Sequence, residues 1–153
     1  MAGTLIVGYY PKPFKPEYKE VNLDAILRSF SSDYFKNAVS IARDLYDKKE
    51  FEKYTLLKNT LPAITFSVIF APSRSAINVQ KYSSLIVMDI DKIGKNIHEL
   101  KIQLSNDPYV LAAWLSPSGD GLKFLIKNGL SQSDHKKIYK EQLSITVPLI
   151  KLR

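Results

Sequence analysis

The chain of 153 residues contains no cysteine and only two histidines. The absence of cysteine excludes disulfide bonds, zinc–thiolate sites and cysteine nucleophiles, and it fits a cytoplasmic protein. The histidines, His98 and His135, lie in polar helical stretches and are more simply explained as surface residues. With so few histidines, a catalytic Ser-His-Asp arrangement has no support in the sequence.

Long apolar runs are also missing. The longest, around residues 64–71, is interrupted by Thr65 and Ser67 and is far shorter than the roughly 18 residues that a membrane span needs. The N-terminus lacks the basic flank and long apolar stretch of a signal peptide. We therefore expect a cytoplasmic globular protein with no membrane partner.

The charges are unbalanced, with 22 lysines and arginines against 15 acidic residues and a net charge of +7. Such an excess favours polyanionic partners such as DNA, RNA or nucleotides. The lysines are spread along the chain, so a solubilising surface is the alternative explanation.

Hydrophobic periodicity predicts a single α/β (α+β) domain over residues 1–153, with an arm and mainly helical part in residues 1–60. We expect residues 61–153 to form an α/β core, in which the order from Leu85 onward is the ferredoxin-like or RRM-like β-α-β-β-α-β. The expected strands are residues 63–70, 85–90, 109–115, 122–127 and an edge strand at 145–149. The expected helices are residues 22–30, 35–46, part of 48–58, 93–104 and 131–143.

Two carboxylates, Asp89 and Asp91, close the apolar strand that begins at Leu85. Alternate residues of a strand point to the same face, so these two side chains project together. Neighbouring like charges repel each other, and a divalent cation such as Mg²⁺ or Mn²⁺ would remove that cost because it prefers oxygen ligands. The alternative is a strand end whose acids face water or pair with Lys92.

A glycine-containing turn follows the next strand. Gly119 and Gly121 allow positive φ and close approach of the backbone, and successive N–H groups of such a turn can bind an anion. Ser116 and Ser118 add hydroxyl donors, and Lys123 adds positive charge. The alternative is an ordinary hairpin turn that carries a lysine.

Taken in order, these blocks resemble the archaeo-eukaryotic primase superfamily, in its VirE N-terminal domain or primase-polymerase (PrimPol) branch. That superfamily has a hydrophobic strand ending in Asp-x-Asp, followed by a helix, a strand and a Ser-x-Gly-x-Gly turn. This chain reads Leu-Ile-Val-Met-Asp89-Ile-Asp91 and later Ser116-Pro-Ser-Gly-Asp-Gly-Leu-Lys123. The stretch from Lys58 to Phe66 also looks like this branch.

The resemblance implies a nucleotidyltransferase that binds a nucleoside triphosphate with Mg²⁺ or Mn²⁺ and acts on single-stranded DNA or RNA. It also implies a phage or mobile-element replication protein with a helicase domain or partner. Asp89 and Asp91 would be the catalytic metal ligands. The residues that would hold the nucleotide phosphates are Ser116, Ser118, Gly119, Gly121, Lys123 and Arg74.

The sequence departs from the primase pattern at two points, and these leave a second function possible. Lys123 stands near the place of the primase histidine, and an ammonium group does not reproduce imidazole hydrogen bonding. No acid follows Glu141, where the superfamily has its third metal-binding acid, so we expect a chain truncated at its C-terminus. The alternative function is a non-catalytic nucleic-acid or nucleotide-binding module that retains the fold. In such a module, Tyr9, Tyr10 and Tyr18 could stack on bases.

Overall fold

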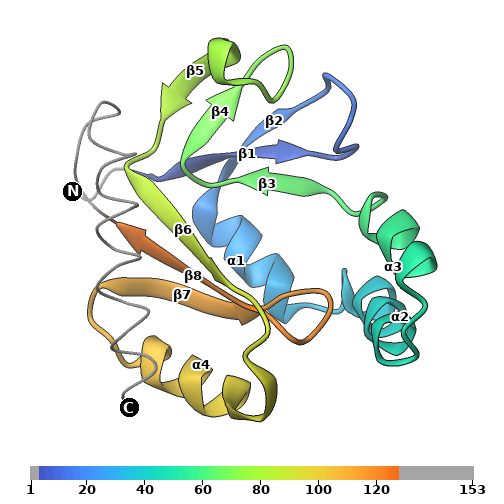
Figure 1. Cartoon of the computed structure of the whole chain (residues 1–153). Coiled ribbons are helices and arrows are strands. Elements are labelled where there is room, and N and C mark those ends of the chain that lie inside the picture. The colour runs from blue at the N-terminus through green and yellow to red at the C-terminus, as the bar shows by residue number, and fades with distance from the viewer. Residues whose placement is uncertain (1–3, 128–153) are drawn as a thin grey trace. The chain divides into compact units, whose positions relative to one another are not determined.

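The computed structural model describes residues 4–127 and shows a mixed α+β protein, which confirms the predicted fold class (Figure 1). The chain divides into two compact units. Unit 1 contains the residues up to Ser83 and residues 117–119, and unit 2 contains residues 84–116 and those from Asp120 onward. The helix predicted at 131–143 and the strand predicted at 145–149 lie outside the described residues. The single domain with a division near residue 60 stays a prediction.

Unit 1 contains two small antiparallel sheets within its described residues. In the first, β1 (Ile6–Tyr10) lies between β2 (Lys19–Asn22) and β3 (Ala63–Thr65). In the second, β4 (Val68–Phe70) pairs with β5 (Val79–Tyr82) after the short 3₁₀ turn η1, whose bounds are Ala76–Asn78.

The first sheet of unit 1 was not foreseen. An arm was expected in the N-terminal part of the chain, whereas Lys19 and Glu20 begin the edge strand β2. That strand exposes three of its four residues, so its sequence has no alternating apolar pattern from which a strand could be predicted. The strand predicted at 63–70 is interrupted after Thr65, and its two halves belong to different sheets.

Three helices complete the described part of unit 1: α1 (Leu23–Ser31), α2 (Lys36–Asp47) and α3 (Phe51–Lys58). Asn22 caps α1, since its side-chain oxygen accepts a hydrogen bond from the Asp24 amide at 2.9 Å. No helix within residues 4–127 is both long enough and apolar enough to cross a membrane.

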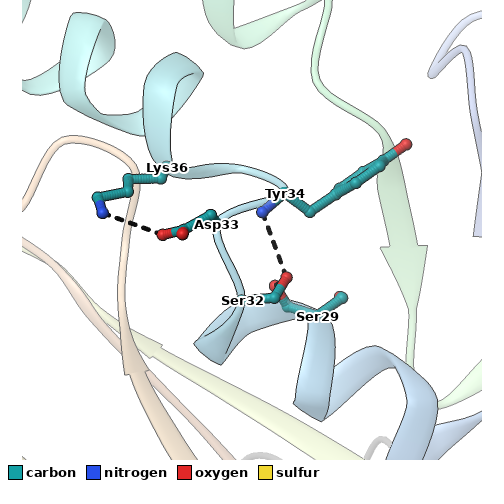
Figure 2. A network of polar contacts seen from close by, with 5 residues as sticks. All are labelled: Ser29, Ser32, Asp33, Tyr34 and Lys36. Atoms are coloured by element: carbon teal, nitrogen blue, oxygen red, sulfur yellow. Dashed lines mark hydrogen bonds and ion pairs between the residues drawn. The ribbon is translucent and has the colours of Figure 1, made fainter.

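The connection between α1 and α2 is held by short-range polar contacts (Figure 2). The Ser32 hydroxyl donates to the Ser29 carbonyl at 2.8 Å and accepts from the Tyr34 amide at 3.3 Å. Lys36 forms an ion pair with Asp33 at 3.0 Å. The bond from Ser32 uses a free carbonyl group at the C-terminal end of α1, which is consistent with α1 ending here.

Unit 2 has the order β-α-β-β over its described residues, in agreement with the first four elements of the predicted ferredoxin-like core. The elements are β6 (Leu85–Ile90), the turn η2 (Gly94–Asn96), α4 (Ile97–Ser105), β7 (Val110–Leu115) and β8 (Leu122–Lys127). The sheet order is β6-β8-β7, and both strand pairs are antiparallel.

One face of this sheet and α4 share an apolar core. Its buried members are Ile86, Met88, Ile97, Leu100, Leu104, Leu122, Phe124 and Ile126. Because side chains alternate along a strand, Asp89 and Lys123 project from the opposite face. The packing of α4 therefore fixes the orientation of the polar residues considered next.

Candidate functional site

Asp89 and Lys123 are direct cross-strand neighbours in β6 and β8. The Lys123 ammonium donates to Asp89 Oδ2 and forms an ion pair with it. The side chains are 29% exposed for the lysine and 41% exposed for the aspartate, so water reaches both groups. The sequence analysis named Lys92 as a possible partner of the acids, but strand pairing brings Lys123 opposite Asp89 instead.

Asp91 lies one residue beyond β6 and contacts the base of the glycine loop. A Cβ atom placed on Gly121 would lie 2.8 Å from Asp91 Oδ1 and 3.0 Å from Ser116 Oγ. Both distances are shorter than side chains normally tolerate, so only glycine leaves room for this approach. The structure therefore brings together Asp91, Ser116 and Gly121, which the sequence analysis had grouped in one site.

Two hydrogen bonds between Ser116 and Gly121 close the loop. The Ser116 amide donates to the Gly121 carbonyl at 2.7 Å, and the Gly121 amide donates to Ser116 Oγ at 3.1 Å. Ser116 is only 6% exposed, so its hydroxyl group is a structural part of the loop. This role differs from the predicted one, in which the hydroxyl donates to a phosphate.

Asp120 ties the loop to the segment that follows Asp91, and the sequence analysis did not identify it. Its carbonyl accepts from the Ile93 amide at 3.2 Å, and its Oδ1 accepts from the Gly94 amide at 3.3 Å. Gly94 and Lys92 have positive φ angles of 69° and 59°, which turn this segment toward α4. An aspartate between two glycines in a turn is a common acceptor of backbone N–H groups, and this signal was available in the sequence.

The two acids offer oxygen ligands, but they do not make a complete metal site. Within residues 4–127, no group of three or more histidine, cysteine, aspartate or glutamate side chains could hold a metal ion. Mg²⁺ commonly uses one or two carboxylates, with water and substrate phosphate as the other ligands. Within the described residues, Asp89 and Asp91 alone do not complete a metal site, so a cation held by them would need further ligands from outside the protein.

The tip of the loop belongs to unit 1 and includes Ser118 and Gly119. Gly119 has a φ of 80°, a left-handed conformation that side chains other than glycine adopt with strain. A Cβ atom at this position would lie 3.4 Å from Nε of Arg43, a residue of α2. No sequence signal distinguished Arg43 from the other polar residues of that helix.

Arg74, predicted to assist phosphate binding, also lies in unit 1. Its guanidinium lies 5.6 Å from the centre of the Tyr10 ring and donates to the Pro13 carbonyl. Tyr10 is 1% exposed, so the suggestion that its ring stacks on a base is wrong. Tyr18 lies 6.0 Å from Tyr10, ring centre to ring centre, and is 37% exposed.

Comparison with known families places the chain in a family. The sequence model described as "BT4734-like, N-terminal domain" matches residues 56–148, which is more than half of the chain. No curated protein and no solved structure matches. The matched family is a different one from the primase superfamily, and nothing in the comparisons points to that superfamily. The assignment to the VirE N-terminal or primase-polymerase branch is therefore wrong.

Proposed function

The chain belongs to the BT4734-like N-terminal domain family, and from this premise we propose that it binds a nucleoside triphosphate together with Mg²⁺ or Mn²⁺ for nucleotidyl transfer to a nucleic-acid strand. The family description names no activity, so the proposal depends on the residues themselves. The observation that carries it is the approach of Asp91 to Ser116 and Gly121. In this proposal, the phosphate chain of the nucleotide lies against this loop, beside the Asp91 carboxylate.

The two aspartates have a defined task in this proposal. Asp89 and Asp91 project from the same side of the β6 strand and its continuation, so their oxygens can share one cation. The remaining ligands come from the triphosphate and from water, as is common for Mg²⁺. When bound, such a cation neutralises phosphate charge and polarises the bond to be broken.

In this proposal, Lys123 has one role before the ligands bind and another role after they bind. In the structure its ammonium group neutralises Asp89. If Asp89 held a cation, Lys123 would lose its ion-pair partner, and its ammonium group could contact a phosphate oxygen as a point charge. The metal and the triphosphate therefore support each other's binding, and we expect the two ligands together to bind more tightly than either one alone.

The second candidate function is a non-catalytic nucleotide or nucleic-acid-binding module. The ion pair between Lys123 and Asp89 favours it, because one of the two acids is already neutralised without a metal. The net charge of +7 supports a polyanionic partner in both cases. A cytoplasmic location, which the absence of cysteine favours, is part of the proposal in both cases.

The melting temperature tests ligand binding. We expect Mn²⁺ and a nucleoside triphosphate together to raise it by more than the sum of their separate effects. The double substitution Asp89→Asn with Asp91→Asn should abolish the joint effect. Asp47→Asn with Glu99→Gln removes the same charge from exposed helical positions and should preserve it. If the wild-type protein responds to neither ligand, alone or combined, the proposal fails.

Incorporation of a labelled nucleotide into a single-stranded DNA or RNA separates the two candidates. The nucleotidyltransferase predicts a labelled, lengthened strand that requires Mn²⁺ or Mg²⁺, and the Asp89→Asn variant should produce none. The binding module predicts retention of the strand that weakens as the salt concentration rises, with no lengthened product. A joint increase in melting temperature without incorporation would favour the binding module.

A further inference from the structure

Arg43 lies against the backbone at the tip of the glycine loop, and both belong to unit 1. A Cβ atom on Gly119 would lie 3.4 Å, 3.6 Å and 3.7 Å from the Nε, Cδ and Cγ atoms of Arg43. The arginine stem therefore extends along the glycine backbone, and its guanidinium group lies beside the tip. A side chain at position 119 would reduce the room for this contact.

The Nε atom of Arg43 is buried and makes no hydrogen bond among residues 4–127. The neighbouring acid Asp44 is engaged elsewhere, since it pairs with Lys48 at 2.7 Å. A buried donor of a charged group without an acceptor destabilises the folded state, and such groups usually have a bound ion or water as a partner. The unpaired Nε therefore points to an anionic ligand.

The chemistry of the Arg43 guanidinium and of the backbone amides at the loop tip indicates which anion they would bind. A guanidinium group presents several N–H donors in one plane and matches two oxygens of a phosphate at once. Consecutive amides next to a residue with positive φ, such as Gly119, can form a concave set of donors for the same anion. A phosphoryl group offers more oxygens and more charge than a carboxylate and can accept from both sets of donors.

We propose that Arg43 and the loop tip at Ser118 and Gly119 form a phosphoryl-binding site that works without a metal ion. This site goes beyond the proposed function, which depends on Asp89 and Asp91 and on a divalent cation. It lies in unit 1, and Arg43 precedes the residues that match the family. The occupant is a phosphate chain of a small molecule, for which inorganic tripolyphosphate is the simplest probe.

Calorimetric titration of the whole chain with tripolyphosphate, in the presence of a metal chelator, tests the site. We expect Arg43→Gln to weaken binding by about tenfold or more, because a charged hydrogen-bonding group is lost. Arg28→Gln removes the same charge from an exposed position of α1 and should leave the affinity unchanged. The double substitution Asp89→Asn with Asp91→Asn should retain this binding or strengthen it, because it removes two negative charges, so this site can succeed when the metal-dependent function fails, and the reverse.

A second measurement does not depend on the folding of any variant. In the wild-type protein, tripolyphosphate should shift the NMR resonance of the Gly119 amide, while the Gly94 amide stays unchanged. Equal loss of affinity in Arg28→Gln and Arg43→Gln would show a general charge effect and overturn the proposal. Binding without a shift of the Gly119 amide, or no binding by the wild-type protein, would overturn it as well.

Discussion

Lys123 of β8 forms an ion pair with Asp89 of β6, its direct neighbour across two antiparallel strands. The lysine is held in this register by six consecutive residue pairs between the strands, from Leu85 with Lys127 to Ile90 with Leu122. The Lys123 ammonium group therefore already pairs with the Asp89 carboxylate, which a divalent cation would need as a ligand. Under the proposed function, Lys123 competes with the metal ion for Asp89, and this competition has measurable consequences.

Lys123→Met should change the affinities for metal and triphosphate in opposite directions. Mn²⁺ alone should bind more tightly, by at most about fivefold, since a partly exposed ion pair contributes up to about 1 kcal/mol. The triphosphate should bind more weakly in the presence of Mn²⁺, because a phosphate contact is lost. Calorimetric titration measures both affinities. Lys127→Met, on the same strand and face, is the control and should change neither.

Ser116→Ala should destabilise the fold, because Gly121 then has a buried amide without its acceptor. We expect a loss of about 1–3 kcal/mol in the free energy of unfolding. Ser105→Ala removes a hydroxyl group that donates to the Lys101 carbonyl on an exposed helix surface, and it should change stability by less than about 0.5 kcal/mol. Urea denaturation measures both values. Equal stability of the two variants would contradict the structural role of Ser116.

Local signals in the sequence predicted most of unit 2. The apolar strand from Leu85, the helical spacing of Ile97, Leu100 and Leu104, and the glycine turn are short-range patterns. They predicted the order β-α-β-β, which the structure confirms. In unit 1, β1, β2 and β5 were missed. An exposed edge strand such as β2 depends on pairing with a distant partner rather than on its own pattern.

The site was predictable only where its residues follow regular geometry. The spacing of Asp89 and Asp91 placed both on one side of a strand, and the glycine turn was visible in the sequence. Which basic side chain pairs with Asp89 depends on the register between β6 and β8. Arg43, which lies close to Gly119, comes from a helix that is far away in the sequence. Such pairings are set by tertiary packing, so no short motif carries them. The binding roles of these residues stay predictions.

The stability of unit 1 should depend on pH through Tyr9. Burial raises the pKa of the Tyr9 phenol above its ordinary value of 10.0, and the charge and hydroxyl group of Tyr34 raise it further. As the pH rises above this ordinary value, the unfolded chain loses the proton first, so the free energy of unfolding falls. Tyr34→Phe should lower the pKa of Tyr9 and make this fall shallower.

Urea denaturation between about pH 9 and about pH 11 measures this dependence, because it spans the ordinary titration of tyrosine. Tyr109→Phe removes a phenol that is 77% exposed and serves as the control, with a profile close to that of the wild-type protein. If Tyr34→Phe and the wild-type protein lose stability with the same slope, Tyr34 has no influence on Tyr9.

Gly121→Ala tests whether the loop and Asp91 act together. The added Cβ would lie 2.8 Å from Asp91 Oδ1 and 3.3 Å from the Ile90 carbonyl oxygen, so the carboxylate must move. We expect a loss of about 1–3 kcal/mol in stability from overpacking, together with loss of the joint response to Mn²⁺ and triphosphate. The melting temperature with and without both ligands measures the two effects.

Gly94→Ala is the matched control for this change. Gly94 has a φ of 69° and nothing within 4 Å of an added Cβ, so alanine costs about 1–2 kcal/mol through backbone strain alone. Both variants should therefore lose similar stability, but only Gly121→Ala should lose the ligand response. If Gly121→Ala responds fully, the displaced Asp91 carboxylate is not a ligand of the cation, and the metal-dependent site is wrong. If Gly94→Ala loses the response equally, general destabilisation explains the loss, and Gly121 has no specific role in the site.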